Sequence, residues 1–249
     1  MTDDEQRFVA LVARRLYLEV MYELQTGGGV ALDGAVKPEH RVTIKRIRER
    51  IGQLRALFDR APRRVARALG MPKHVLDVGA GRAPWSIELA RMSPTTRITA
   101  IDLPEELSAL DEAIRAAAVE SQFVTMALDV FRPRRNHELH SESYDLAILA
   151  NVSHCFDARH NEELLRRVVP LIRYGGVLAI IEQVLDEKPD WARWAALYAT
   201  GALHSAPGGY IFPLNVHRQR LEGCGCTGLR AIEICPLPPL TLLTAHRTH

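Results

Sequence analysis

Apolar positions divide this chain into a helical beginning and an alternating remainder. Over residues 5–25 the apolar side chains recur every three or four positions, which predicts an amphipathic helix. From residue 71 onward short apolar runs alternate with helical patterns, and this alternation predicts an α/β sheet with helices on both faces. Strands are expected over residues 73–78, 97–101, 122–126, 145–150, 177–181, 229–234 and 240–245.

The same pattern places the helices and a domain boundary. Helices are predicted over residues 84–92, 105–118, 160–173, 190–203 and 213–222. Gly175 and Gly176 are expected to turn the chain from the third of these helices into the fifth strand. A short helix that ends at Gly70 precedes the first strand. We therefore divide the chain into a helical leader over 1–70, expected to cover the ligand side, and an α/β domain over 71–249.

Composition places the chain among ordinary globular proteins. It has 249 residues, of which 47% are hydrophobic and 25% charged, a size that suits one domain with a small appendage. No apolar run is long enough to span a bilayer, and the acidic start of the chain is not a secretory signal. Four cysteines in a chain of this length do not form a disulfide scaffold, so we expect a reducing cytoplasm.

The net charge of +2 gives no global case for nucleic acid, but one segment is strongly basic. Residues 41–67 hold ten Arg or Lys side chains against only Glu49 and Asp59, and they flank an apolar helical stripe. The plain interpretation is a solvated helix face. The alternatives are an anionic substrate, or an acidic partner such as a carrier domain or nucleic acid.

The stretch after the first predicted strand carries the clearest chemistry. Gly79 and Gly81 lack side chains, so the chain can turn sharply there and a ligand can approach its backbone. Pro84 suits the first position of a helix, but it replaces the third glycine of the dinucleotide fingerprint Gly-x-Gly-x-x-Gly. Asp77 indicates a cationic or amine-bearing ligand beside the turn. Asp102, which ends the second strand, could accept hydrogen bonds from both hydroxyls of a ribose.

At these positions the chain resembles the class I S-adenosylmethionine-dependent methyltransferases. The run Leu-Asp-Val-Gly-Ala-Gly over 76–81, followed by Asp102, is similar to the motif with which that family holds the methionine part and the ribose of its cofactor. The resemblance implies that Asp129 accepts from the adenine amine while Val130 or Phe131 packs on the ring. It also implies a Rossmann-like, doubly wound seven-stranded sheet, mostly parallel with an antiparallel last strand. The implied cofactor-binding residues are Asp77, Gly79, Ala80, Gly81, Asp102, Leu103, Asp129, Val130 and Asn151.

Two further stretches resemble the small-molecule O-methyltransferases of the plant and actinobacterial type. They are the Asp-Leu-Pro turn at 102–104 and the segment 151–167, where that family has a His-Asp-Trp run before a helix. This resemblance implies His154 as general base and Glu182, at the end of the fifth strand, as the acid that orients it. An imidazole titrates near neutrality and can accept a phenol proton as the methyl group moves, while a carboxylate behind it fixes the tautomer.

Three features depart from that family. Cys155 replaces its Asp, no carboxylate follows the glycine pair at 208–209, and residues 1–70 are too short for its winged-helix dimerisation domain plus substrate helices. Carbon or nitrogen methylation on the same fold therefore stays open, as does a cofactor-binding partner protein without transferase activity. Family-style dimerisation does not follow, and a homodimer is one option among several.

We expect a cytoplasmic enzyme that moves a methyl group from S-adenosylmethionine to a hydroxyl of a small, aromatic secondary metabolite. Trp194, His204 and Tyr210 could line the acceptor pocket, although isolated residues of these types more often serve packing. Cys224 and Cys226, with His217 nearby, match no zinc spacing, so no metal site is predicted.

Overall fold

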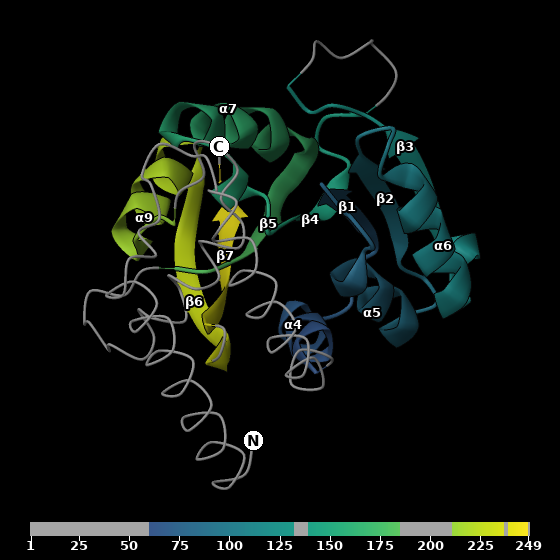
Figure 1. Ribbon diagram of the computed structural model, residues 1–249. Helices are drawn as coiled ribbons and strands as arrows, with labels where there is room; N and C mark the ends of the chain where they lie inside the picture. Colours follow the sequence, from purple (N-terminus) through teal and green to yellow (C-terminus); the bar gives the residue numbers. More distant parts are fainter. Residues whose placement is uncertain (1–59, 132–138, 185–210, 237–238, 249) are drawn as a thin grey trace, which may run out of the picture.

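The computed structural model describes residues 60–131, 139–184, 211–236 and 239–248. They form one seven-stranded sheet in the order β3-β2-β1-β4-β5-β7-β6 (Figure 1). The strands are β1 (His74–Val78), β2 (Arg97–Asp102), β3 (Phe123–Ala127), β4 (Tyr144–Ala150), β5 (Ile172–Glu182), β6 (Cys226–Pro236) and β7 (Pro239–Arg247). The first five strands pair in parallel, whereas β7 runs antiparallel to both β5 and β6. The predicted Rossmann-like sheet with an antiparallel last strand is confirmed.

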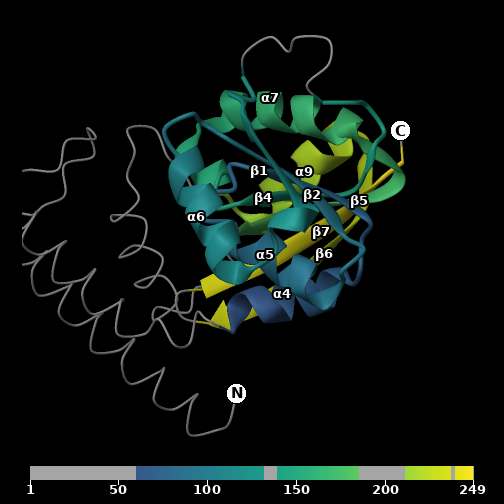
Figure 2. The same ribbon diagram turned by 90° about the vertical axis from the view of Figure 1, so that its right-hand side faces the viewer.

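Helices cover both faces of this sheet (Figure 2). On one face lie α4 (Ala61–Leu69), α5 (Pro84–Met92) and α6 (Leu107–Ala117), and on the other lie α7 (Ala158–Val168) and α9 (Leu214–Gly223). The short 3-10 helices η1 (Glu120–Gln122), η2 (Ser153–Cys155) and η3 (Val169–Leu171) connect these elements. No helix among the described residues is both long enough and apolar enough to cross a bilayer.

The core has two halves because successive side chains of a strand point to opposite faces. In β1 the fully buried Val75 packs in the layer of α4, α5 and α6, while its equally buried neighbour Leu76 packs in the layer of α7 and α9. Both faces of the central strands are therefore apolar, which explains their continuous hydrophobic runs in the sequence.

The prediction of a helix over about 160–173 is wrong at its end. Helix α7 stops at Val168, η3 follows, and β5 begins at Ile172, before Gly175 rather than after it. Pro170 lies inside η3, and a proline has no N–H with which to continue an α-helix. The fifth strand, predicted over 177–181, therefore starts five residues earlier than expected, whereas the other predicted elements within the described residues agree with the structure to within about three residues at their ends. Two predicted helices, over 5–25 and 190–203, lie outside the described residues. Most of the basic segment, residues 41–59, lies outside them as well.

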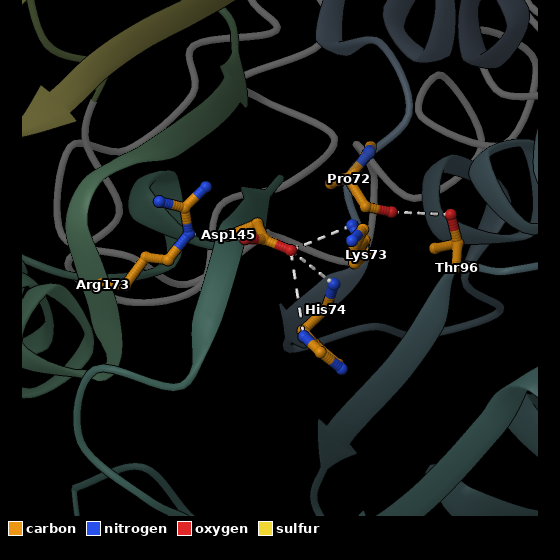
Figure 3. Close-up of polar contacts among 6 residues, drawn as sticks. All are labelled: Pro72, Lys73, His74, Thr96, Asp145 and Arg173. Carbon is orange, nitrogen blue, oxygen red and sulfur yellow. Dashed lines mark hydrogen bonds and ion pairs between the residues drawn. The ribbon is translucent and has the colours of Figure 1, made fainter.

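A polar cluster fixes the amino ends of three strands relative to one another (Figure 3). Asp145, in β4, accepts hydrogen bonds from the amides of Lys73 (2.9 Å) and His74 (2.8 Å) and from Nε of Arg173 in β5 (2.5 Å). Burial opposes ionisation of Asp145, but these hydrogen bonds outweigh it and hold the pKa of the carboxyl below its ordinary value. The cluster aligns β1, β4 and β5 at the end of the sheet opposite to the glycine turn.

Candidate functional site

The glycine turn after β1 is fastened to the carboxyl end of β2. The amides of Gly79 and Ala80 both donate to the carbonyl of Ile101, at 2.9 and 3.2 Å, and the amide of Ala83 closes the turn on the carbonyl of Ala80 at 2.7 Å. Gly79 and Gly81 take φ angles of 65° and 55°, in the left-handed region that side chains disfavour. Helix α5 then begins at Pro84, as predicted.

The two glycines of the turn are needed for different reasons. A Cβ atom on Gly79 would lie 2.8 Å from Cγ2 of Val152, in the segment between β4 and α7. A Cβ atom on Gly81 would have no described atom within 4 Å, so this side of the turn faces open space. Gly79 therefore lets two loops of the protein pack together, and Gly81 leaves the backbone accessible to a ligand.

Asp102 holds the turn from the end of β2. One oxygen of its carboxylate accepts from the amide of Gly81 at 2.7 Å, and the other accepts from the amide of Leu103 at 2.8 Å. Asp102 is half-buried and Leu103 is 40% exposed, so both lie at the open edge of the sheet. A carboxylate oxygen can accept more than one hydrogen bond, and each oxygen of Asp102 keeps a further lone pair for a hydroxyl donor.

Asp77 lies beneath the turn rather than beside it. The residue is only 1% exposed, and one of its oxygens accepts a 2.6 Å hydrogen bond from the hydroxyl of Ser86 in α5. Burial raises the pKa of Asp77 to about 6, the Ser86 hydrogen bond opposes this rise, and the charge of Asp102 adds to it. Sequence reasoning missed Ser86, although a serine inside the buried run of α5 signals an internal partner.

The residues predicted for the adenine ring follow β3. Asp129 and Val130 are both half-buried, and a carboxylate oxygen of Asp129 accepts from the amide of Phe131 at 2.9 Å. The ring of Phe131 meets that of Phe156 edge to face, with centroids 4.9 Å apart. Aromatic edges and half-buried aliphatic groups thus accompany Asp129, which is a suitable environment for a planar ring.

The segment after β4 is held by the end of β5. Asn151 is exposed, has a φ of 56°, and donates through its amide to the carbonyl of Ile181 at 2.9 Å. The amide of Ser153 donates to a carboxylate oxygen of Glu182 at 2.8 Å, and Glu182 is only 2% exposed. The backbone of His154 belongs to η2, while its side chain lies outside the described part of the structure. Glu182 therefore contacts the residue that directly precedes the predicted base.

Sequence reasoning also missed Asn161, in the first turn of α7. Its side-chain amide donates to the carbonyls of Ser153 (2.9 Å), Phe156 (2.9 Å) and Asp157 (3.0 Å). A signal for it does exist in the sequence. Asn161 falls at helical spacing with the apolar positions Leu164, Leu165 and Val168, so a polar residue interrupts the buried face of the helix.

The remaining predicted residues do not join this arrangement. Trp194, His204 and Tyr210 lie outside the described residues. Burial raises the pKa of the Cys226 thiol to about 11 and lowers the pKa of His217 to about 4. Within the described ranges, no three His, Cys, Asp or Glu side chains are grouped as metal ligands.

Comparison with known proteins gives a consistent picture. The family model described as an O-methyltransferase domain matches residues 60–210. The 3-hydroxy-5-methyl-1-naphthoate 3-O-methyltransferase of Streptomyces sahachiroi is 26% identical over 161 residues, which make up 65% of this chain and 45% of that protein. The matched segments cover less than half the length of each of the curated relatives found.

Solved structures share the fold. The O-methyltransferase family 2 protein of Planctomyces limnophilus, in complex with apigenin, superposes with a TM-score of 0.65 at 22% identity, over 78% of this chain and 60% of that one. Human N-acetylserotonin methyltransferase, in complex with S-adenosylmethionine, superposes with a TM-score of 0.62 at 19% identity, over 95% and 67% of the two chains. At these identities the likeness establishes the architecture of the sheet and its helices.

Proposed function

We infer the function of this chain from the family to which it belongs, the O-methyltransferase domain family. We propose that the chain transfers a methyl group from S-adenosyl-L-methionine to a hydroxyl of a small aromatic secondary metabolite and releases S-adenosyl-L-homocysteine. The observation that carries this proposal is the glycine turn closed by Asp102 within the matched residues. The acceptor class is supported by the relative that is named for methylation of a hydroxynaphthoate.

The environment of Asp77 fits the cationic end of this cofactor. Among the described residues Ser86 is its only hydrogen-bond donor, so a buried carboxylate is left without a positive partner. A nearby cation favours ionisation and would offset the burial that raises the pKa of Asp77. The cofactor, when bound, supplies a methyl group on a sulfonium and an ammonium group, and Gly81 leaves room for the chain that carries them.

The neighbouring residues suit the nucleoside end. Asp102 has free lone pairs at the open edge, and we assign it to the ribose hydroxyls, with the exposed side chain of Leu103 packing beside them. We assign Asp129 and Val130 to the adenine ring, because they follow the adjacent strand at the same edge. Asn151 completes this set at the end of β4. Together these residues would orient the cofactor across the carboxyl ends of β1 to β4.

A base must take the hydroxyl proton of the acceptor as the methyl group is transferred. We propose His154, because η2 places its backbone at the carboxyl end of β4, next to the buried carboxylate of Glu182. An imidazole can accept that proton near neutral pH, and Glu182 would stabilise the resulting imidazolium. General-base catalysis of this kind contributes roughly 10²–10⁴-fold to the rate.

The cofactor assignment is tested by calorimetric titration with S-adenosylhomocysteine, run beside NAD. We expect binding of the first ligand alone, and weaker binding by Asp102→Asn, which keeps the size of the side chain but replaces one acceptor oxygen. Glu105→Gln is the matched control, because this exposed acid lies three residues away in the turn before α6. A preference for NAD, or equal affinity in Asp102→Asn and wild type, would refute the assignment.

The transfer step is tested with a panel of hydroxynaphthoates, flavonoids and other phenols. Release of S-adenosylhomocysteine together with an O-methylated product supports the proposal, and His154→Ala should slow that release without weakening cofactor binding. A product methylated on carbon or nitrogen would identify the alternative transferases. Cofactor binding without release from any acceptor would identify a partner protein that lacks transferase activity.

We also propose that the basic segment 41–67 attracts an anionic acceptor or an acidic partner. In its described part, α4 carries three arginines on the face opposite to its buried alanine and valine side chains. Arg63 pairs with Glu88 at 3.3 Å and Arg64 donates to a backbone carbonyl at 2.6 Å, which leaves Arg67 without a partner among the described residues. The affinity for an acidic carrier protein should fall as the salt concentration rises, and it should be lower for Arg67→Gln than for wild type. The control variant Arg218→Gln, in α9, should bind the carrier as tightly as wild type does.

The setting of this reaction is part of the proposal. We infer a reducing cytoplasm, as the cysteine count suggested. All four cysteines of the chain are free thiols in the structure, which fits that setting.

A further inference from the structure

Asn161 is a buried amide on an apolar helix face. It is 3% exposed, in the first turn of α7, on the face that carries Leu164, Leu165 and Val168 into the core. Burial of an amide without hydrogen bonds costs free energy on the order of 1–3 kcal/mol, so its partners indicate why the residue is tolerated.

The partners of Asn161 all belong to the segment that links β4 to α7. The side-chain amide donates at 2.9 Å to the carbonyl of Ser153, at 2.9 Å to that of Phe156 and at 3.0 Å to that of Asp157. Ser153 and Phe156 lie on either side of the dipeptide that contains His154. A single side chain therefore ties together both ends of the turn that carries the proposed base.

Ser153 is held from the opposite side as well. Its amide donates to Glu182 at 2.8 Å, while its carbonyl accepts from Asn161 at 2.9 Å. The turn itself is closed by two backbone hydrogen bonds, from Cys155 to the carbonyl of Val152 (3.1 Å) and from Phe156 to that of Ser153 (3.2 Å). The backbone amide and the backbone carbonyl of Ser153, the residue before His154, are thus both held by buried side chains.

Capping of α7 does not explain these hydrogen bonds. Asp157 already caps the helix, because its carboxylate accepts from the amide of His160 at 2.9 Å. Two of the three acceptors of Asn161 lie before that cap and outside the helix. The amide of Asn161 consequently acts on the preceding turn rather than on the start of α7.

We propose that Asn161 is a positioning residue for methyl transfer, which acts by holding the backbone of His154 in place through Ser153 and Phe156. The inference rests on the proposed role of His154 as base. In this proposal the backbone position of His154, in η2, depends on a side chain of α7 as well as on Glu182 of β5. Misplacement of a catalytic group by about 1 Å can slow a reaction by about 10²-fold.

The test is Asn161→Leu, which keeps the shape of the side chain and removes both donors. We expect kcat to fall by about 10–100-fold. Acceptor KM and affinity for S-adenosylhomocysteine should stay within about threefold of wild type, because neither ligand contacts Asn161 in this proposal. If Asn161→Leu does not fold, Asn161→Ser takes its place, since its short hydroxyl cannot reach the carbonyl of Ser153 and the same loss is expected.

Gln122→Leu is the matched control. The side-chain amide of Gln122 also donates to two backbone carbonyls, those of Ser93 (2.8 Å) and Thr96 (3.1 Å), but at the amino end of the sheet. Both variants lose a comparable set of hydrogen bonds, so both should unfold at lower denaturant. Only Asn161→Leu should lose kcat, and an equal loss of kcat in Gln122→Leu would reduce Asn161 to a contributor to stability and overturn the proposal.

A second readout does not need an acceptor. The titration of the His154 imidazole is followed by NMR and assigned with His154→Gln. We expect its midpoint to differ between wild type and Asn161→Leu, but not between wild type and Gln122→Leu. An unchanged kcat in Asn161→Leu, with His154→Ala impaired, would overturn this inference alone. Full activity of His154→Ala would overturn the assignment of the base, and this inference with it.

Discussion

Two carboxylates of the site lie in the last two positions of neighbouring strands but differ in environment. Asp77 is almost fully buried with a hydroxyl as its donor, while the half-buried Asp102 accepts from two backbone amides. Burial without charge compensation makes ionisation of Asp77 costly, which is why its pKa rises to about 6. Asp102 therefore shapes the turn, whereas the hydrogen bond that Asp77 accepts from Ser86 brings no positive charge to its buried carboxylate.

The raised pKa of Asp77 predicts a dependence of stability on pH. The native state binds a proton on the Asp77 carboxyl more tightly than the unfolded chain does. Protonated Asp77 therefore contributes to the free energy of unfolding fully below pH 4, and this contribution is lost as the pH rises through about 6. A shift of this size corresponds to roughly 3 kcal/mol. In Asp77→Asn the free energy of unfolding should change less over this range, as measured by urea denaturation at several pH values.

Asp111→Asn is the control for this series, because its half-buried carboxylate also accepts a hydroxyl hydrogen bond, from Thr125, but belongs to α6 rather than to the strand beneath the glycine turn. The same measurement extends to the ligand. Affinity of wild type for S-adenosylhomocysteine should fall as pH drops below about 6, since protonation removes the charge of Asp77. An identical pH dependence in Asp77→Asn would show that another group titrates.

Gly79 and Val152 allow a prediction about packing between the two loops. Gly79→Ala should be destabilised by its positive φ and by the contact that its Cβ would make at 2.8 Å. Val152→Ala opens that space, so the double variant should recover part of the lost stability. The measurement is a double-mutant cycle of unfolding free energies, with Gly81→Ala as the comparison. Strictly additive effects would contradict direct packing.

Individual residues of the site were predictable where their type is restricted by chemistry. The glycines stand out because few residues tolerate a left-handed turn, and Asp102 stands out because a carboxylate at the end of the neighbouring strand can accept several hydrogen bonds. Ser86 and Asn161 were missed, because the partner of a buried polar side chain depends on which elements pack together. The sequence motif also suggested a ligand for both glycines, whereas Gly79 makes room for Val152.

At the scale of elements, the strands depend on polar contacts at their amino ends. Asp145→Ala would leave the amides of Lys73 and His74 and the guanidinium of Arg173 without this acceptor (Figure 3). We expect a loss of unfolding free energy on the order of 2–3 kcal/mol, measured by urea denaturation. Affinity for S-adenosylhomocysteine should be unchanged, and a large loss of affinity would mean that the two ends of the sheet are coupled.

Helices and strands were predicted well where the spacing of apolar residues and the residues that start or stop an element indicate the same bounds. Helix α5 begins at Pro84 and ends at Met92, as its apolar spacing and its proline indicated. The end of α7 was misjudged because Val169 continues the apolar period beyond the last α-helical residue, while Pro170 prevents the helix from continuing. The end of α7 is therefore set by the missing N–H of Pro170 and not by the spacing of apolar residues.

At the scale of the molecule, the proposed site lies at the carboxyl ends of the parallel strands, and the Asp145 cluster lies at their amino ends. Hydrogen exchange with and without S-adenosylhomocysteine should show this division. Exchange at the amides of Gly79 and Gly81 should slow on binding, while exchange at Lys73 and His74 should not change. Protection at the amino end alone would place the ligand elsewhere.

The strand order could not be derived from periodicity. Alternation of apolar residues indicates which face of a strand is buried, but it does not identify the neighbouring strand. The parallel part followed from the βα alternation, and the antiparallel pair followed from the family resemblance. The position of β7 between β5 and β6 is known from the structure.

That position has a consequence for synthesis of the chain. The ribosome makes β6 before β7, yet β6 pairs in this sheet only with β7. A growing chain can therefore assemble β1 to β5 early, while the edge of β5 stays unpaired until β7 arrives. An open edge invites association with other chains, so we expect this protein to be most prone to aggregation in the interval before β7 has been made.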